Sequence, residues 1–268
     1  MPDPVPVAAA ESVTRLGDVA GKVLVAGSHA GVIAAWYGAK AGAHALILND
    51  AGVGKDRAGI AGLVYLEAIG MAAAAVDCMS ARIGDGADML ARGVVSHANL
   101  FAARCGVVAG QACRDAAERM RVATAPRCGP PPYVEGRWRL SQGPPEVWAI
   151  DSLGKIEPQD AGRILVIGSH GALLGGRPES ALAVNAAAAV FNDAGVGADH
   201  IGISHLPALA ARGIPAASVD CMSARIGDGR SMWDSGLLSH VNAVTGRIGV
   251  ARGMSVRDFA RAVATSWR

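Results

Sequence analysis

The sequence predicts an α/β protein made of two homologous halves, each with a parallel sheet that has helices on both faces. NDAGVG occurs at Asn49–Gly54 and at Asn192–Gly197, and VDCMSARIGDG occurs unchanged at Val76–Gly86 and Val219–Gly229. Both pairs are 143 positions apart (192 − 49 and 219 − 76). In each half, short apolar runs alternate with helical patterns, which is typical of βαβ units and a parallel sheet.

The internal duplication extends well beyond these two motifs. With the same spacing of 143, 26 of the 40 residues in Ile47–Gly86 are identical to their counterparts. Gly27–His29 matches Gly168–His170 at a spacing of 141, so the second copy carries two extra residues between these matches. Two long copies indicate a pair of halves related by a pseudo-two-fold axis, because a solenoid needs at least three short repeats.

Three apolar runs in each half, each followed by a turn, predict buried strands. The runs are Lys22–Ala26, Ala45–Leu48 and Ala72–Val76 in the first copy, and Arg163–Ile167, Ala188–Phe191 and Ala216–Val219 in the second. Helical patterns between the strands include Gly31–Ala41 and Leu206–Arg212. Ser255, followed by Asp258, predicts the capped start of the last helix.

The predicted domain organisation follows from the duplication and from the prolines. It consists of an N-terminal segment (1–20), a first α/β half (21–125), a linker (126–155) and a second α/β half (156–268). The stretch Pro126–Pro145 holds six prolines and several glycines, which predicts an extended linker over the surface.

Composition and charge exclude several classes of partner. The 268-residue chain has a formal net charge of +2, so neither nucleic acid nor an anionic membrane surface is expected. The longest apolar stretch, Gly31–Leu48, is interrupted by Lys40 and His44 and is not expected to span a bilayer. The start has no basic region typical of a signal peptide, so a cytoplasmic location is expected.

Cysteine use and low charge lead to two further expectations. The five cysteines include no CxxC pair, so neither a disulfide framework nor a thiolate zinc site is expected. Charged residues make up 18 % of the chain and the mean hydropathy is +0.29. A monomer with these values would expose apolar patches, so a homo-oligomer is expected.

Polar residues shared by the two copies follow the predicted strands, and ligands of parallel sheets bind at the carboxyl ends of strands. The candidate catalytic residues are Ser28, His29, Asp50, Asp77, Ser80, Asp85 and His97, with Ser169, His170, Asp193, Ser223, Asp228 and His240 in the second copy. The candidate substrate-binding residues are Arg82, Arg225, Asn49, Asn99, Asn192 and Asn242.

The residue types suggest roles for these groups. Arg82 and Arg225 offer a planar fork that suits a carboxylate or phosphate, and Asp85 and Asp228 would orient the arginine or act as a base. The structural alternatives are an internal Arg–Asp ion pair that fixes the loop and an ion pair across the interface between the halves. For the asparagines and the glycines of the motifs, the alternative is ordinary turn chemistry.

The histidines suggest anion binding and proton transfer. The Ser-His pairs lie on a strand–Gly–helix turn whose N–H groups suit an anion, although no dinucleotide or P-loop motif is present. His97 and His240, each in a Ser-His-x-Asn sequence, are candidate general bases. No organic cofactor is predicted. A divalent metal ion held by His and Asp side chains is the alternative.

Cys78 and Cys221 are the two cysteines found in both copies, each directly after a predicted strand. One thiolate from each half would suit a two-base racemase or isomerase, whereas the structural alternative is a small buried apolar residue. The copies also differ, since Lys55 and Arg57 correspond to Ala198 and His200, and His205 has no histidine counterpart. Such differences would specialise one site.

The function expected from these residues is an enzyme acting on a small carboxylate- or amide-bearing metabolite. Hydrolysis of an amide or lactam C–N bond is favoured because Ser, His and Asp dominate the shared set. The alternatives are a cofactor-independent two-cysteine racemase and a non-catalytic ligand-binding or assembly protein.

Overall fold

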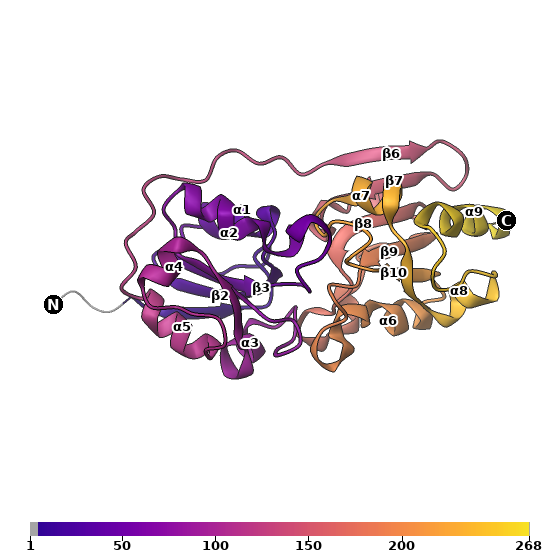
Figure 1. Cartoon of the computed structure of the whole chain (residues 1–268). Helices are drawn as coiled ribbons and strands as arrows, with labels where there is room; N and C mark the ends of the chain where they lie inside the picture. Colours follow the sequence, from indigo (N-terminus) through magenta and orange to yellow (C-terminus); the bar gives the residue numbers. More distant parts are fainter. Residues whose placement is uncertain (1–4, 268) are drawn as a thin grey trace. The chain divides into compact units, whose positions relative to one another are not determined.

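The computed structural model describes residues 5–267 and divides the chain into two compact units, each with its own sheet (Figure 1). Unit 1 consists of Met1–Val53, Arg57–Tyr133 and Gly197–Asp199. Unit 2 consists of Gly54–Asp56, Val134–Val196 and His200–Arg268. Each unit therefore includes a three-residue segment that lies within the other half of the sequence.

Unit 1 contains a five-stranded sheet in the order β1-β2-β3-β4-β5. The strands are β1 (Val7–Ala10), β2 (Val23–His29), β3 (Ala45–Asn49), β4 (Ala73–Val76) and β5 (Val95–Ala98). The first four strands are parallel, and β5 runs antiparallel to β4. Every residue of β2, β3 and β4 is buried, as expected for continuous apolar runs in a parallel sheet.

The helices of unit 1 pack against both sets of alternating strand residues. They are α1 (Val32–Lys40), α2 (Ala61–Ala68), α3 (Gly86–Arg92), α4 (Leu100–Arg104) and α5 (Cys113–Met120). Leu46 belongs to one core cluster together with Leu66 of α2. Its neighbour Ile47 belongs to a second cluster with Met89 of α3 and Met120 of α5. Successive side chains of a strand point to opposite faces, so the two clusters cover both sides of the sheet.

Unit 2 contains a six-stranded sheet in the order β11-β10-β9-β8-β7-β6. The strands are β6 (Arg137–Ser141), β7 (Val147–Ile150), β8 (Ile164–His170), β9 (Ala188–Asn192), β10 (Ala216–Val219) and β11 (Leu238–Val241). Strands β7 to β10 are parallel, whereas β6 and β11 run antiparallel to their neighbours. The predicted α/β class is thus confirmed, but the sheets are mixed rather than wholly parallel.

Two segments predicted to lie outside the sheets contribute strands to them. Segment 126–155, predicted as a surface linker, contains β6 and β7, and segment 1–20 contains β1. The prolines do not prevent this pairing, because they precede β6 or lie at Pro144 and Pro145 between β6 and β7. Proline is excluded from the interior of a ladder but not from the connections between strands.

The helices of unit 2 are α6 (His205–Ala211), α7 (Gly229–Ser235), α8 (Ala243–Arg247) and α9 (Val256–Ser266). The predicted cap of α9 is confirmed, since Ser255 Oγ accepts a hydrogen bond from the Asp258 backbone at 3.1 Å. Two short 3₁₀ turns, Leu174–Gly176 and Pro178–Ser180, follow β8 in the place where α1 follows β2. Within residues 5–267, no helix has the length and apolar character needed to cross a bilayer.

Candidate metal centre

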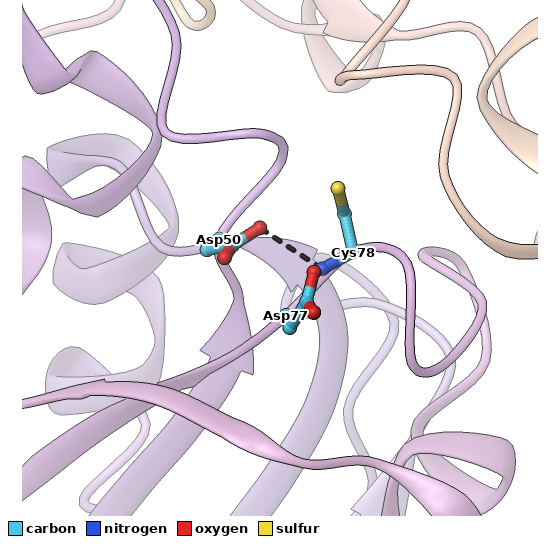
Figure 2. Close-up of side chains that lie close together, drawn as sticks. All are labelled: Asp50, Asp77 and Cys78. Atoms are coloured by element: carbon cyan, nitrogen blue, oxygen red, sulfur yellow. Dashed lines mark hydrogen bonds between the residues drawn. The ribbon is translucent and has the colours of Figure 1, made fainter. Parts of the chain in front are cut away.

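Asp50, Asp77 and Cys78 meet at the carboxyl ends of two adjacent strands of unit 1 (Figure 2). Asp50 directly follows β3, and Asp77 and Cys78 directly follow β4. One ligand atom from each of the three side chains lies within 4.8 Å of the other two. In unit 2, Asp193, Asp220 and Cys221 form the same group after β9 and β10. Each residue of the second group lies 143 positions after its counterpart in the first (193 − 50).

Backbone N–H groups hold both carboxylates in place. Asp50 Oδ1 accepts hydrogen bonds of 3.0 Å from Gly52 N and from Cys78 N. Asp77 Oδ1 accepts a hydrogen bond of 2.8 Å from Met79 N. Each of these backbone bonds uses Oδ1, which fixes the orientation of both carboxylates. Orientation by outer partners of this kind is typical of metal ligands.

The thiol of Cys78 is held in its protonated form by its surroundings. Burial, together with the charges of Asp50 and Asp77, raises the pKa of Cys78 to about 12. Burial and the charges of Asp193 and Asp220 likewise raise the pKa of Cys221 to about 12. A divalent cation placed among the three donors would reverse this balance, because it stabilises a thiolate and compensates both carboxylates.

The loop that carries Asp50 has an unusual backbone. Ala51, Gly52 and Val53 have φ angles of 50°, 72° and 62°, all in the left-handed region. This conformation is strained for alanine and more so for a β-branched valine, at a cost of about 1–3 kcal/mol for each such residue. Ala194, Gly195 and Val196 repeat the angles at 51°, 74° and 65°. The predicted turn role of the glycines is confirmed, and the strain extends to their non-glycine neighbours.

The donor set matches a borderline transition metal. Two carboxylate oxygens and one thiolate sulfur suit Zn²⁺ better than Mg²⁺ or Ca²⁺, which prefer oxygen alone. Three protein donors also leave a coordination position for water or substrate, which is the arrangement of catalytic rather than structural zinc sites. A zinc site with a single cysteine contains no CxxC pair, so the absence of such pairs from the sequence does not exclude it.

The side chains of the four predicted asparagines form hydrogen bonds with backbone groups of turns and helix ends. Asn49 Oδ1 accepts from Ala51 N at 2.9 Å, and Asn192 Oδ1 accepts from Ala194 N at the same distance. Asn99 caps α4 and also bonds the backbone of Ala73, Met71 and Leu63. Asn242 caps α8 and makes the equivalent bonds in unit 2. These contacts correspond to the turn and cap chemistry named above as the alternative.

Ser80 and Asp85 likewise make local backbone contacts. Ser80 Oγ donates to Asp77 O at 2.7 Å and accepts from Val94 N at 2.9 Å, which fixes the loop after β4. Ser223 makes the corresponding bonds in unit 2. Asp85 is the N-cap of α3, and Asp228 is the N-cap of α7. These four residues shape the loops that carry the donors.

The two predicted substrate arginines are paired with carboxylates. Arg82 Nε donates to Asp199 Oδ2 at 2.8 Å in unit 1. Arg225 donates to Asp228 Oδ2 at 2.8 Å and to Asp56 Oδ2 at 3.1 Å in unit 2. The internal ion pair, stated above as one structural alternative, is therefore present at both positions.

The Ser-His pairs form turns at the same edge of each sheet as the metal centre. Ser28 Oγ accepts from Val13 N at 3.1 Å, and His29 Nδ1 accepts from Gly31 N at 3.1 Å. Ser169 and His170 make the matching contacts with Leu153 N and Ala172 N. An accepting Nδ1 places the proton of the neutral ring on Nε2. Burial lowers the pKa of His170 to about 4.

His97 and His240 lie away from the three-donor groups. His97 is in β5, opposite Ala75 in the ladder, and its Nδ1 lies 3.1 Å from Ser96 Oγ. His240 is in β11, opposite Ser218, with the same contact to Ser239 at 3.2 Å. Neither histidine belongs to the groups of three donors found among residues 5–267.

Three acidic residues and one arginine, in the loops or on α3, were missed by sequence reasoning. Asp199 and Asp56 occupy equivalent positions two residues after NDAGVG, so their recurrence in both copies was a usable signal. Arg92 and Asp88 are four residues apart on α3, the spacing of a helical ion pair, and their side chains meet at 2.9 Å. The hydrogen bonds from Arg92 and Arg82 lower the pKa of Asp199.

No protein-family model, curated protein or solved structure matches this chain. Its function is therefore inferred from the geometry and chemistry of the candidate metal centre.

Proposed function

We propose that this protein is a metal-dependent hydrolase that cleaves the C–N bond of a small amide or lactam carrying a carboxylate. The observation that carries the proposal is the convergence of Asp50, Asp77 and Cys78 at the carboxyl edge of the sheet, repeated by the matching group in unit 2. This edge is where open α/β sheets bind their ligands.

In this proposal each group of three donors holds one Zn²⁺ ion. The metal would supply a water of lowered pKa and polarise the scissile carbonyl. Asp50, Asp77 and Cys78 fix its position, and their combined negative charge keeps it bound. His29 lies at the end of the neighbouring strand, opposite Asn49 in the ladder, and is the candidate donor to the developing oxyanion.

The two-cysteine racemase is less well supported by the thiol environments. A thiolate base needs a pKa close to the working pH, whereas both thiols have pKa values raised to about 12. The carboxylates beside each cysteine cause part of this shift and would oppose a free thiolate. The same carboxylates favour a bound cation.

The non-catalytic alternative is favoured by one observation, the pairing of Arg82 and Arg225 with aspartates. Paired arginines are what a loop held together by ion pairs requires. This alternative also allows a bound metal, so metal binding alone does not separate it from an enzyme. Turnover separates the two.

The test begins with metal stoichiometry. Chain stripped with EDTA is titrated calorimetrically with Zn²⁺, Mn²⁺ and Mg²⁺, and we expect two Zn²⁺ ions per chain. Asp77→Asn and Asp220→Asn form a matched pair, because asparagine keeps the Oδ1 acceptor used by Met79 N or Met222 N. Each single variant should bind one ion, and the double variant should bind none.

Hydrolysis is measured as amine release from primary amides, N-acyl amino acids and carboxylated lactams, with and without Zn²⁺. We expect turnover that requires Zn²⁺ and is lost in the double variant. Binding of two ions without turnover across the panel would support the non-catalytic alternative. Binding of no metal at all would overturn the proposed centre.

A further inference from the structure

Within unit 1, two arginines converge on a single carboxylate oxygen. Asp199 Oδ2 accepts hydrogen bonds from Arg82 Nε at 2.8 Å and from Arg92 Nη2 at 2.7 Å. Arg92 Nε also bonds Asp88 at 2.9 Å, which holds its guanidinium in this orientation. Two guanidinium groups around one carboxylate make a strong and geometrically specific carboxylate-binding arrangement.

The carboxylate is presented beside the metal centre. Ala198 N donates to Cys78 O at 2.7 Å, so the Gly197–Asp199 segment lies against the loop that carries two of the three donors. A Cβ atom built on Gly197 would lie 3.1 Å from Cys78 O, which shows how closely this segment packs. A carboxylate bound by Arg82 and Arg92 is therefore close to the proposed reaction centre.

Unit 2 lacks the second arginine. Ser235 stands where unit 1 has Arg92, 143 positions earlier. Arg225 is the counterpart of Arg82. It donates to Asp228, the N-cap residue of α7, at 2.8 Å and also to Asp56. Lys55 Nζ donates to Ser235 Oγ at 2.8 Å, so the second cation on this side of unit 2 is an ammonium group and not a guanidinium. Unit 1 therefore has two guanidinium groups around its carboxylate, and unit 2 serves as a control with one.

We propose that Arg82 and Arg92 form a binding site for a small organic carboxylate and that Asp199 occupies this site when the ligand is absent. The side chains of Arg82, Arg92 and Asp199 are 44 %, 41 % and 48 % exposed, so a ligand from solution can reach them. The inference deepens the proposed hydrolase by naming the anchor for the substrate's carboxylate. Binding itself requires neither metal nor turnover.

Asp199 is suited to being displaced. Each half-exposed ion pair contributes only about 0–1 kcal/mol, because water and salt screen it. Asp199 also has a φ angle of 56°, a left-handed conformation that is unfavourable for most non-glycine residues. A free carboxylate that makes the same two hydrogen bonds has no such backbone constraint.

The test replaces the internal carboxylate. In Asp199→Asn the charge is removed, while asparagine tolerates the left-handed φ at least as well as aspartate. Each chain is stripped of metal with EDTA and dialysed free of it, and succinate and its uncharged diamide are then titrated by calorimetry at low ionic strength. We expect Asp199→Asn to bind succinate roughly two- to thirtyfold more tightly than the original chain, which is the loss of two surface ion pairs expressed as affinity. The diamide should not bind.

Two variants serve as controls. Asp56→Asn makes the same change at a φ angle of 54° in unit 2, where no second arginine is present, and should not increase succinate affinity. The double variant Arg92→Ser, Asp199→Asn has serine at this position, as unit 2 does at Ser235. It should lose the increase in succinate affinity expected for Asp199→Asn.

Three results would overturn the clamp. The first is equal succinate affinity in the original chain and Asp199→Asn, and the second is an equal gain in Asp56→Asn. The third is inorganic phosphate binding as tightly as succinate, which would make the site a general anion site. Because no metal is present, these results are independent of whether Zn²⁺ binds or a substrate is hydrolysed.

Discussion

At the scale of single residues, unit 2 contains a buried histidine, His205, at a position where unit 1 has none. His205 is fully buried and stands where unit 1 has Gly62, with its ring 4.6 Å from that of Phe191 in an edge-on contact. Burial, together with repulsion from His170, lowers the pKa of His205 to about 3. Both rings are therefore neutral at pH 7.

The lowered histidine pKa values make stability depend on pH. Below pH 6.5, the ordinary pKa of histidine, His205 binds a proton in the unfolded chain but stays neutral in the folded chain. The free energy of unfolding is therefore unaffected by His205 above pH 6.5 and decreases as the pH falls towards 3. At pH 5 the loss from His205 is about 2 kcal/mol. Urea unfolding at pH 7 and at pH 5 measures this loss in the free energy of unfolding.

His205→Leu, of similar volume, should reduce the difference in stability between pH 7 and pH 5 by about 2 kcal/mol. His200→Gln is the control, because His200 is exposed. That control should keep the original pH dependence. An unchanged pH dependence in His205→Leu would contradict the assignment.

At the scale of elements, the loop between β3 and α2 requires a glycine. A Cβ atom at Gly59 would lie 2.2 Å from Asp50 O, and one at Gly202 would lie 2.1 Å from Asp193 O. Both are contacts with backbone atoms, which cannot move away as a flexible side chain can. The close approach holds the strained loop against the following turn and thereby positions the carboxylate.

Gly59→Ala should therefore lower the free energy of unfolding by about 1–3 kcal/mol and reduce bound Zn²⁺ from two ions to one. Gly202→Ala should have the matching effect in unit 2. Gly246→Ala is the control, because nothing lies within 4 Å of its added Cβ atom in α8. It should be neutral or stabilising. Two tightly bound ions in Gly59→Ala would contradict the role given to this loop.

The central strands could be predicted from sequence because continuous apolar runs identify fully buried strands. The edge strands could not, since β6 reads Arg-Trp-Arg-Leu-Ser and β5 contains Ser96 and His97, which looked like site residues. The placement of Asp50 and Cys78 at the strand ends was predictable from topology. Their grouping with Asp77 as metal donors was not, because it depends on left-handed angles at Ala51 and Val53 that these residue types do not favour.

At the scale of the whole molecule, composition leads to an expectation about assembly. Charged residues are only 18 % of the chain, and Val122 and Val134 are more than four-fifths exposed at 82 % and 87 %. We expect association of copies to cover such residues. Sedimentation equilibrium should give a mass that is a multiple of 27.1 kDa. A mass of one chain at all concentrations tested would contradict this expectation.

The three-residue segments Gly54–Asp56 and Gly197–Asp199 have a consequence for how the gene can be divided. A cut between Tyr133 and Val134 separates the two main bodies of the units, yet each product lacks a segment that its own unit needs and carries one that it does not. Neither half of the coding sequence therefore encodes a complete unit.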